Sequence, residues 1–226
     1  FKLSFWKLAI AGFFFVQIGE VILNTGLRAQ VLALLPLSAL IYILMRSSEK
    51  PKLLWTIPLL MLLWANMHGT FVYGLLIIAV FFGVWFFKYP NKRLLLIGIG
   101  LLSIATTVLN PNTTVVYFEV FKHSTSPFLK NVYEWRPITQ NCSTCHAPVF
   151  IFYLIILFFA FIDTPTINNL PFLILSLILV IPTFNYRRNL PVFAIVTLPL
   201  LASYMESWKF DLAKYKVTPY IFLIGA

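Results

Sequence analysis

The chain has 226 residues, of which 60% are hydrophobic and only 11% charged, and its mean hydropathy is +0.89. Soluble domains contain fewer apolar and more charged residues, so the composition excludes an ordinary soluble fold and indicates an integral membrane protein. The net charge of +10 does not indicate a nucleic-acid partner, because the basic residues stand in short clusters between apolar runs, as topology determinants do.

Apolar runs bounded by Pro, Asn, Gly or basic clusters follow one another along the chain. They lack the polar alternation of a membrane β-barrel, and their lengths are near the lower limit of the ~17–25 residues that span a bilayer. The sequence therefore predicts an all-α, polytopic transmembrane helix bundle of eight to nine spans, a single membrane domain over 1–226. In chain order the runs occupy 5–24, 29–46, 53–68, 70–87, 94–109, 147–163, 169–184 and 190–205, with a ninth beginning near 218. Because the chain begins at Phe1 and stops inside an apolar stretch, we expect it to be an excerpt of a longer protein.

The lysines and arginines are distributed unequally over the two sides of this predicted bundle. By the positive-inside rule, the richer side is cytoplasmic. That side has Lys2, Lys7, Arg46, Lys50, Lys52, Lys88, Lys92, Arg93, Lys209, Lys214 and Lys216, and the other has Arg28, Lys122, Lys130, Arg136, Arg187 and Arg188. The outer side also carries the long loop 110–147, whose many aromatic residues predict short amphipathic helices on the membrane surface.

Several polar residues on the outer side are candidates for binding. Arg28 is either a snorkelling interfacial arginine or a phosphate ligand, since a guanidinium offers a planar fork of donors. Arg187 and Arg188 oppose the positive-inside trend and therefore need a counter-charge such as a lipid headgroup or a bound phosphate. Trp64 and His68 stand four residues apart and share one helical face. His68 is a general acid or base, a hydrogen-bond donor to a phosphate, or a capping group.

These segments carry a resemblance to a known superfamily. In order they are LRAQ (27–30), LWANMHGTFVYG (63–74), LNP (109–111), YEWRP (133–137) and YRRNLPVFAI (186–195). The set resembles bacterial polytopic membrane proteins related to the GT-C glycosyltransferases, which include protein O-mannosyltransferases and aminoarabinose transferases. The resemblance implies transfer of a sugar from a polyprenyl-phosphate-linked donor on the extracytoplasmic face of a bacterial inner or plasma membrane. Substrate-binding residues would be Arg28, Trp64, Asn66, His68, Arg187 and Arg188, with the arginines and His68 neutralising the donor phosphate.

The chain departs from the GT-C pattern in one respect. The acidic residue expected in the first extracytoplasmic loop is absent, because the only carboxylate there, Glu20, stands inside an apolar run. Glu119 and Glu134 also fall on the outer side, but no motif marks either as the base. We therefore expect the catalytic base to lie upstream of Phe1. No cofactor is certain, although a divalent metal is compatible with the resemblance.

The stretch NCSTCHAP (141–148) contains both cysteines, as Cys-x-x-Cys-His. On the outer side this spacing permits either attachment of a c-type haem or a local disulfide between Cys142 and Cys145. The surroundings are not those of a cytochrome, and no axial ligand is dictated, so the disulfide is favoured over haem c.

Two alternatives to glycosyl transfer remain open from the sequence. The first is a redox membrane protein that uses Cys142, Cys145 and His146 for haem or thiol chemistry. The second is a transporter of an anionic or lipid-linked substrate. Transporters place polar or charged residues near the bilayer midplane, whereas the spans of this chain are nearly free of charge, so the transporter ranks below the transferase.

Overall fold

The computed structural model describes residues 12, 29–140, 146–163, 166 and 168–207. All regular secondary structure within these ranges is helical, so the all-α prediction is confirmed there. Apart from residue 12, the first and ninth predicted runs lie outside the described residues. The α-helices are α2 (Ala29–Leu32), α3 (Leu34–Arg46), α4 (Ile57–Met67), α5 (Phe71–Lys88), α6 (Arg93–Thr107), α7 (Val115–Ser124), α8 (His146–Asp163), α9 (Leu170–Asn185) and α10 (Leu190–Ser207). Short 3₁₀ turns join them, namely η1 (Pro51–Thr56), η2 (Pro90–Lys92), η3 (Pro127–Asn131), η4 (Tyr133–Trp135) and η5 (Arg187–Asn189).

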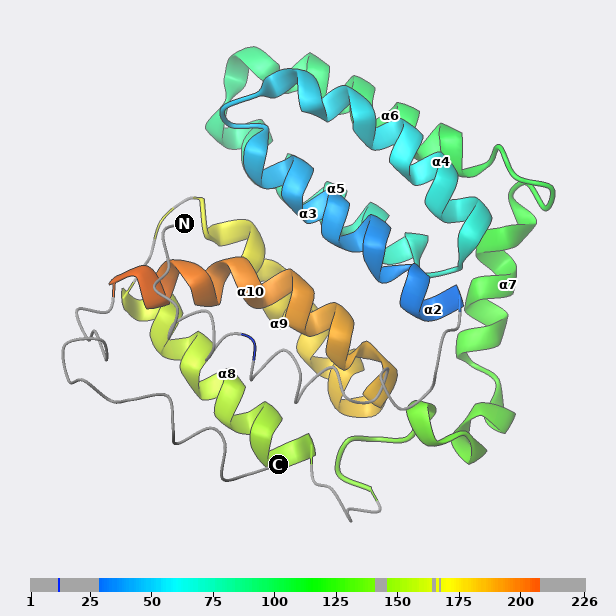
Figure 1. Cartoon of the computed structure of the whole chain (residues 1–226). Helices are drawn as coiled ribbons and strands as arrows, with labels where there is room; N and C mark the ends of the chain where they lie inside the picture. Colours follow the sequence, from blue (N-terminus) through cyan, green and yellow to red (C-terminus); the bar gives the residue numbers. More distant parts are fainter. Residues whose placement is uncertain (1–11, 13–28, 141–145, 164–165, 167, 208–226) are drawn as a thin grey trace.

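The helices form two groups that lie side by side. Figure 1 shows α2 to α6 as one group and α8 to α10 as the other, with α7 lying across one end of the first group. Contacts of α5 with α9 and of α3 with α10 join the two groups. Proline stands in the first turn of α4 and α9, where its missing N–H removes no helical hydrogen bond.

Three helical stretches are long and apolar enough to cross a membrane: Ala29–Arg46, Phe71–Lys88 and Arg187–Glu206. Ala147–Asp163 and Leu170–Asn185 are apolar but shorter. The membrane character of the chain is thus supported by length and composition, whereas eight to nine spans stay a prediction.

The interior is apolar, and its few hydroxyl groups are satisfied within the helices. Ser103, Ser176, Thr183 and Thr197 each donate to the carbonyl four residues earlier, at 2.6–2.8 Å. This local bonding removes the cost of an unpaired polar group away from water.

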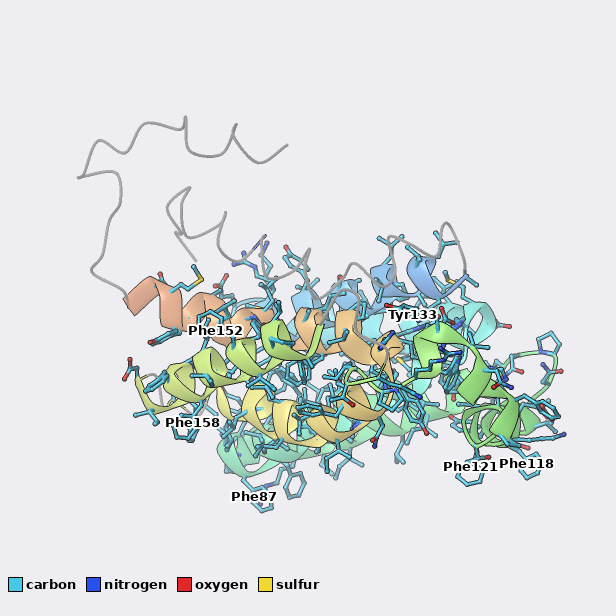
Figure 2. All side chains as sticks on the ribbon, turned by 90° about the horizontal axis from the view of Figure 1, so that it is seen from below. Phe87, Phe118, Phe121, Tyr133, Phe152 and Phe158 are labelled. Atoms are coloured by element: carbon cyan, nitrogen blue, oxygen red, sulfur yellow. The ribbon has the colours of Figure 1, made fainter. Side chains whose placement is uncertain are left out.

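The outer surface of the bundle is also apolar. Leu94 is 86% exposed and Phe87 is 79% exposed, and Figure 2 shows Phe87 and Phe158 projecting away from the helices. An exposed apolar surface of this kind is compatible with contact to lipid.

Because successive helices alternate in direction, the bundle has two distinct ends. One end is here called the basic end. There Lys88, the last residue of α5, donates from Nζ to Oδ1 of Asn168, which lies just before α9, at 2.5 Å. At the other, here called the site end, the hydroxyl of Tyr73 donates to Oδ1 of Asn189 at 2.8 Å. This bond joins the start of α5 to the start of α10.

The predicted loop 110–147 is folded at the site end, and its described part contains the short helices α7, η3 and η4. Tyr117 of α7 packs edge-on against Phe71, with ring centroids 5.2 Å apart, and its hydroxyl bonds Oγ1 of Thr107. Figure 2 shows Phe118 and Phe121 projecting outward from the same helix. The short helices are therefore present as predicted, and their place on an outer membrane surface stays a prediction.

Candidate functional site

The turn between α4 and α5 fixes the ring of His68. Trp64 donates from Nε1 to Oγ1 of Thr70 at 3.1 Å, and that oxygen lies 3.0 Å from Nδ1 of His68. The amide N–H of Thr70 donates to the same Nδ1 at 3.2 Å. Since an amide can only donate, Nδ1 is an acceptor, and the proton of the neutral imidazole is assigned to Nε2.

The surroundings of His68 favour this neutral form. Burial lowers the pKa of His68 from its ordinary value of 6.5, and the nearby Arg188 and His123 lower it further. At neutral pH the imidazole is therefore uncharged and presents an Nε2–H donor. It is better suited to donate a hydrogen bond than to act as a cation.

Asn66 has a structural part in the same turn. Its Nδ2 donates to the carbonyl of Leu62 at 2.8 Å and to that of Leu109 at 3.1 Å. Both amide hydrogens are thereby used, and the end of α4 is tied to the start of the long loop. The neighbouring Gly69 is also constrained, because an added Cβ would lie 2.7 Å from Cγ2 of Val120 in α7.

Arg188 lies in η5, just before α10, and lines a cavity with Trp64 and Thr70 of this turn. Its guanidinium carbon lies 4.0 Å from the centroid of the Trp135 ring, a cation–π contact. The carboxylate of Glu134 also interacts with it electrostatically. Arg188 lines a small cavity together with Gln30, Trp64, Thr70, Tyr73 and Asn189. The cavity measures about 10 Å³, which is room for about one water molecule.

Arg187 points elsewhere, because successive residues of a 3₁₀ turn are rotated by about 120°. Its side chain is only 1% exposed. It donates from Nε to the carbonyl of Pro137 at 3.2 Å and from Nη2 to the carbonyl of Gln140. Its guanidinium carbon lies 4.3 Å from the centroid of the Tyr133 ring. Within the described ranges, Nη1 has no hydrogen-bond partner.

Aromatic rings connect the loop to both arginines. Trp135 packs edge-on against His123 and against Tyr186, with centroids 5.5 Å apart in each case. From the sequence, His123 and Trp135 belong to the long loop and Tyr186 to the segment YRRNLPVFAI, and none of the three is among the predicted binding residues. The motif YEWRP was the available signal for Trp135, since binding residues are disproportionately found on loops.

The structure brings together part of the predicted site. Trp64, Asn66, His68 and Arg188 lie at the site end, with Tyr73, Thr70, His123 and Trp135 as additional members. Arg187 is adjacent but faces the loop. Arg28 and the Cys142–Cys145 pair lie outside the described residues. In the part of the chain that the structure describes, no group of three or more His, Cys, Asp or Glu side chains is arranged to hold a metal ion.

The side chains at the site end suit an anion, although the cavity beside Arg188 has room for about one water molecule. They offer the guanidinium of Arg188 and the neutral donor of His68, near an otherwise apolar bundle, where a charge-assisted hydrogen bond is stronger than in water. No protein-family model, curated protein or solved structure matches the chain.

Proposed function

We propose that the protein is a membrane glycosyltransferase of the GT-C type, which binds the phosphate of a polyprenyl-linked sugar at the site end. The observation that supports this is that Arg188 interacts electrostatically with His68 and lines a cavity with Trp64 and Thr70, the residues that hold His68, at one end of an apolar helix bundle. In the same proposal the bundle crosses a bacterial inner or plasma membrane eight to nine times, with the site end outside.

In the proposed chemistry, negative charge develops on the phosphate of the donor, next to Arg188. The acceptor hydroxyl attacks the anomeric carbon, the bond from that carbon to the phosphate oxygen breaks, and the polyprenyl phosphate leaves with the bonding electron pair. The guanidinium of Arg188 and the Nε2–H of His68 would stabilise that charge as it develops. The proton of the acceptor hydroxyl passes to a carboxylate base.

Three other predicted ligands receive different roles in this proposal. Arg187 donates from Nε and Nη2, and Asn66 from Nδ2, to backbone carbonyls of the loop and its start, so in this proposal both residues position the loop. Trp64 orients His68 through Thr70.

Binding of a polyprenyl phosphate, compared with the corresponding polyprenol, tests the phosphate site. We expect the purified protein to prefer the phosphate, and Arg188→Ala to weaken its binding by about 10- to 150-fold, the equivalent of about 1.5–3 kcal/mol for a charge-assisted hydrogen bond. Lys122→Ala is the control, because it removes an exposed cation of α7. Equal binding of phosphate and alcohol by the unaltered protein would exclude a phosphate site.

Transfer itself is tested in membrane vesicles supplied with a radiolabelled lipid-linked sugar. The proposal expects a new glycosidic product that depends on Arg188. Movement of the labelled lipid across the vesicle membrane without such a product would favour the transporter instead.

A further inference from the structure

A second cleft opens at the basic end, away from Arg188. It measures about 530 Å³ and is bounded by the ends of α3 and α5, the start of α9 and part of α10. The buried Phe81, Leu96 and Phe172 form its apolar wall, whereas exposed Ser48 and Asn168 and half-buried Lys92 form its polar wall. A volume of this size is in the range of small-molecule sites.

Lys92 lines the cleft, and Lys88 is bonded to Asn168 of its polar wall, so both lysines bring positive charge to it. The Nζ atoms of Lys88 and Lys92 lie 5.0 and 5.1 Å from the centroid of the Tyr89 ring. Among the described residues, the ion pair at this end joins Arg46 to Glu49 at 2.8 Å. Neither Lys88 nor Lys92 has a carboxylate partner among those residues. An anion is therefore the complementary ligand.

The position of the cleft indicates where this anion comes from. Candidate spans end at Arg46 and at Lys88, so the cleft lies at the level where lipid headgroups meet hydrocarbon. Trp85 and Tyr89 line it, and aromatic residues next to lysines are typical of that level. A free anion would contact only the polar wall of the cleft, whereas a phospholipid would also contact the apolar wall through its acyl chain.

We propose that this cleft binds an anionic glycerophospholipid. The ammonium group of Lys92 contacts the lipid phosphate, Ser48 and Asn168 face the polar part of the headgroup, and the first carbons of an acyl chain lie against Phe81, Leu96 and Phe172. Basic pockets between helices on the positive side of a membrane protein bind such headgroups. The inference does not rest on glycosyl transfer, because the two sites occupy opposite ends of the bundle.

Native mass spectrometry of the purified full chain tests the proposal, with phosphatidylglycerol and phosphatidylcholine of equal chain length as probes. We expect the unaltered protein to retain phosphatidylglycerol preferentially. Lys92→Gln should weaken that binding about fivefold, the equivalent of about 1 kcal/mol for one lysine near the headgroups, and Lys92→Arg should preserve it. Lys52→Gln is the matched control, since it removes an exposed charge from the same end without altering the lining of the cleft.

A second variant separates loss of the site from loss of folding. Ser48→Trp fills the cleft mouth and leaves the lysines in place, and it should lower lipid binding while the protein stays monodisperse. Equal binding in the unaltered protein and Lys92→Gln, or an equal loss in Lys52→Gln, would overturn the proposal. Displacement of phosphatidylglycerol by an equal concentration of inorganic phosphate would assign the cleft to free phosphate and overturn it as well.

Discussion

Arg187 and Arg188 are adjacent in the sequence, but their guanidinium groups meet different surroundings. Arg187 is buried and bonded to loop carbonyls, whereas Arg188 lies over Trp135 and lines the small cavity. A guanidinium that has given its donors to backbone carbonyls stabilises the fold, and one beside a cavity can meet a ligand. The two residues therefore have separable roles.

Methionine at each position separates these roles. Arg187→Met removes the hydrogen bonds to the carbonyls of half-buried Pro137 and exposed Gln140, at a cost of about 0.5–1.5 kcal/mol for each bond. We expect a lower melting temperature and faster proteolysis of the loop. Arg188→Met should instead weaken polyprenyl phosphate binding with little change in melting temperature. The opposite pattern in a thermal-shift and binding comparison would reverse the assignment.

His68 gives the stability a specific pH dependence. Because burial lowers its pKa in the folded protein below the ordinary value of 6.5, the unfolded chain takes up a proton first as the pH falls. The stability linked to His68 is thus complete above about pH 6.5 and declines below it, until the folded imidazole is protonated too.

Thermal unfolding between pH 7.5 and pH 5.5 measures this effect. His68→Asn retains an acceptor oxygen for the amide of Thr70 but does not titrate, so the variant should lose less stability than the unaltered protein on acidification. A stability difference between the two proteins that is the same at every pH would contradict a lowered pKa.

At the scale of elements, the position of α7 is set by its contact with the α4–α5 turn. Gly69 meets Val120 there, and a β-branched side chain has little freedom to move aside. The loop helix can approach the turn closely only because residue 69 lacks a Cβ.

A double-mutant cycle tests this contact. Gly69→Ala should destabilise the protein by about 1–3 kcal/mol through overpacking, and adding Val120→Ala should recover much of that loss. Strictly additive effects in denaturant unfolding would show that α7 does not press on the turn.

At the scale of the whole molecule, the alternating helices separate a basic end from a site end. The distribution of lysine and arginine predicts that the basic end is cytoplasmic. Two exposed positions, Ser48 at the basic end and Asn112 before α7, allow a direct measurement of this orientation.

Labelling of single cysteines in intact cells performs that measurement, in a background where Cys142 and Cys145 are serine. A membrane-impermeant maleimide should label Asn112→Cys from outside and label Ser48→Cys only after the membrane is permeabilised. Labelling of both in intact cells, or of Ser48→Cys alone, would contradict the predicted orientation.

The sequence by itself determined the all-helical class and the helix positions, because long apolar runs and their basic or proline boundaries are local properties of the chain. Apart from α7, which lies in the long loop, the described α-helices fall within a few residues of the predicted runs. The sequence also placed Trp64, His68 and Arg188 on one side, since alternating spans return to the same end.

Only the tertiary structure decided which side chains meet. It separated Arg187 from Arg188, gave Asn66 a structural bond to Leu109, and added Tyr73 through its bond to Asn189, 116 residues away. It also revealed the cleft at the basic end, whose walls come from helices distant in the chain. Such contacts depend on how helices pack and on the direction of each side chain, and neither is encoded in local hydrophobicity.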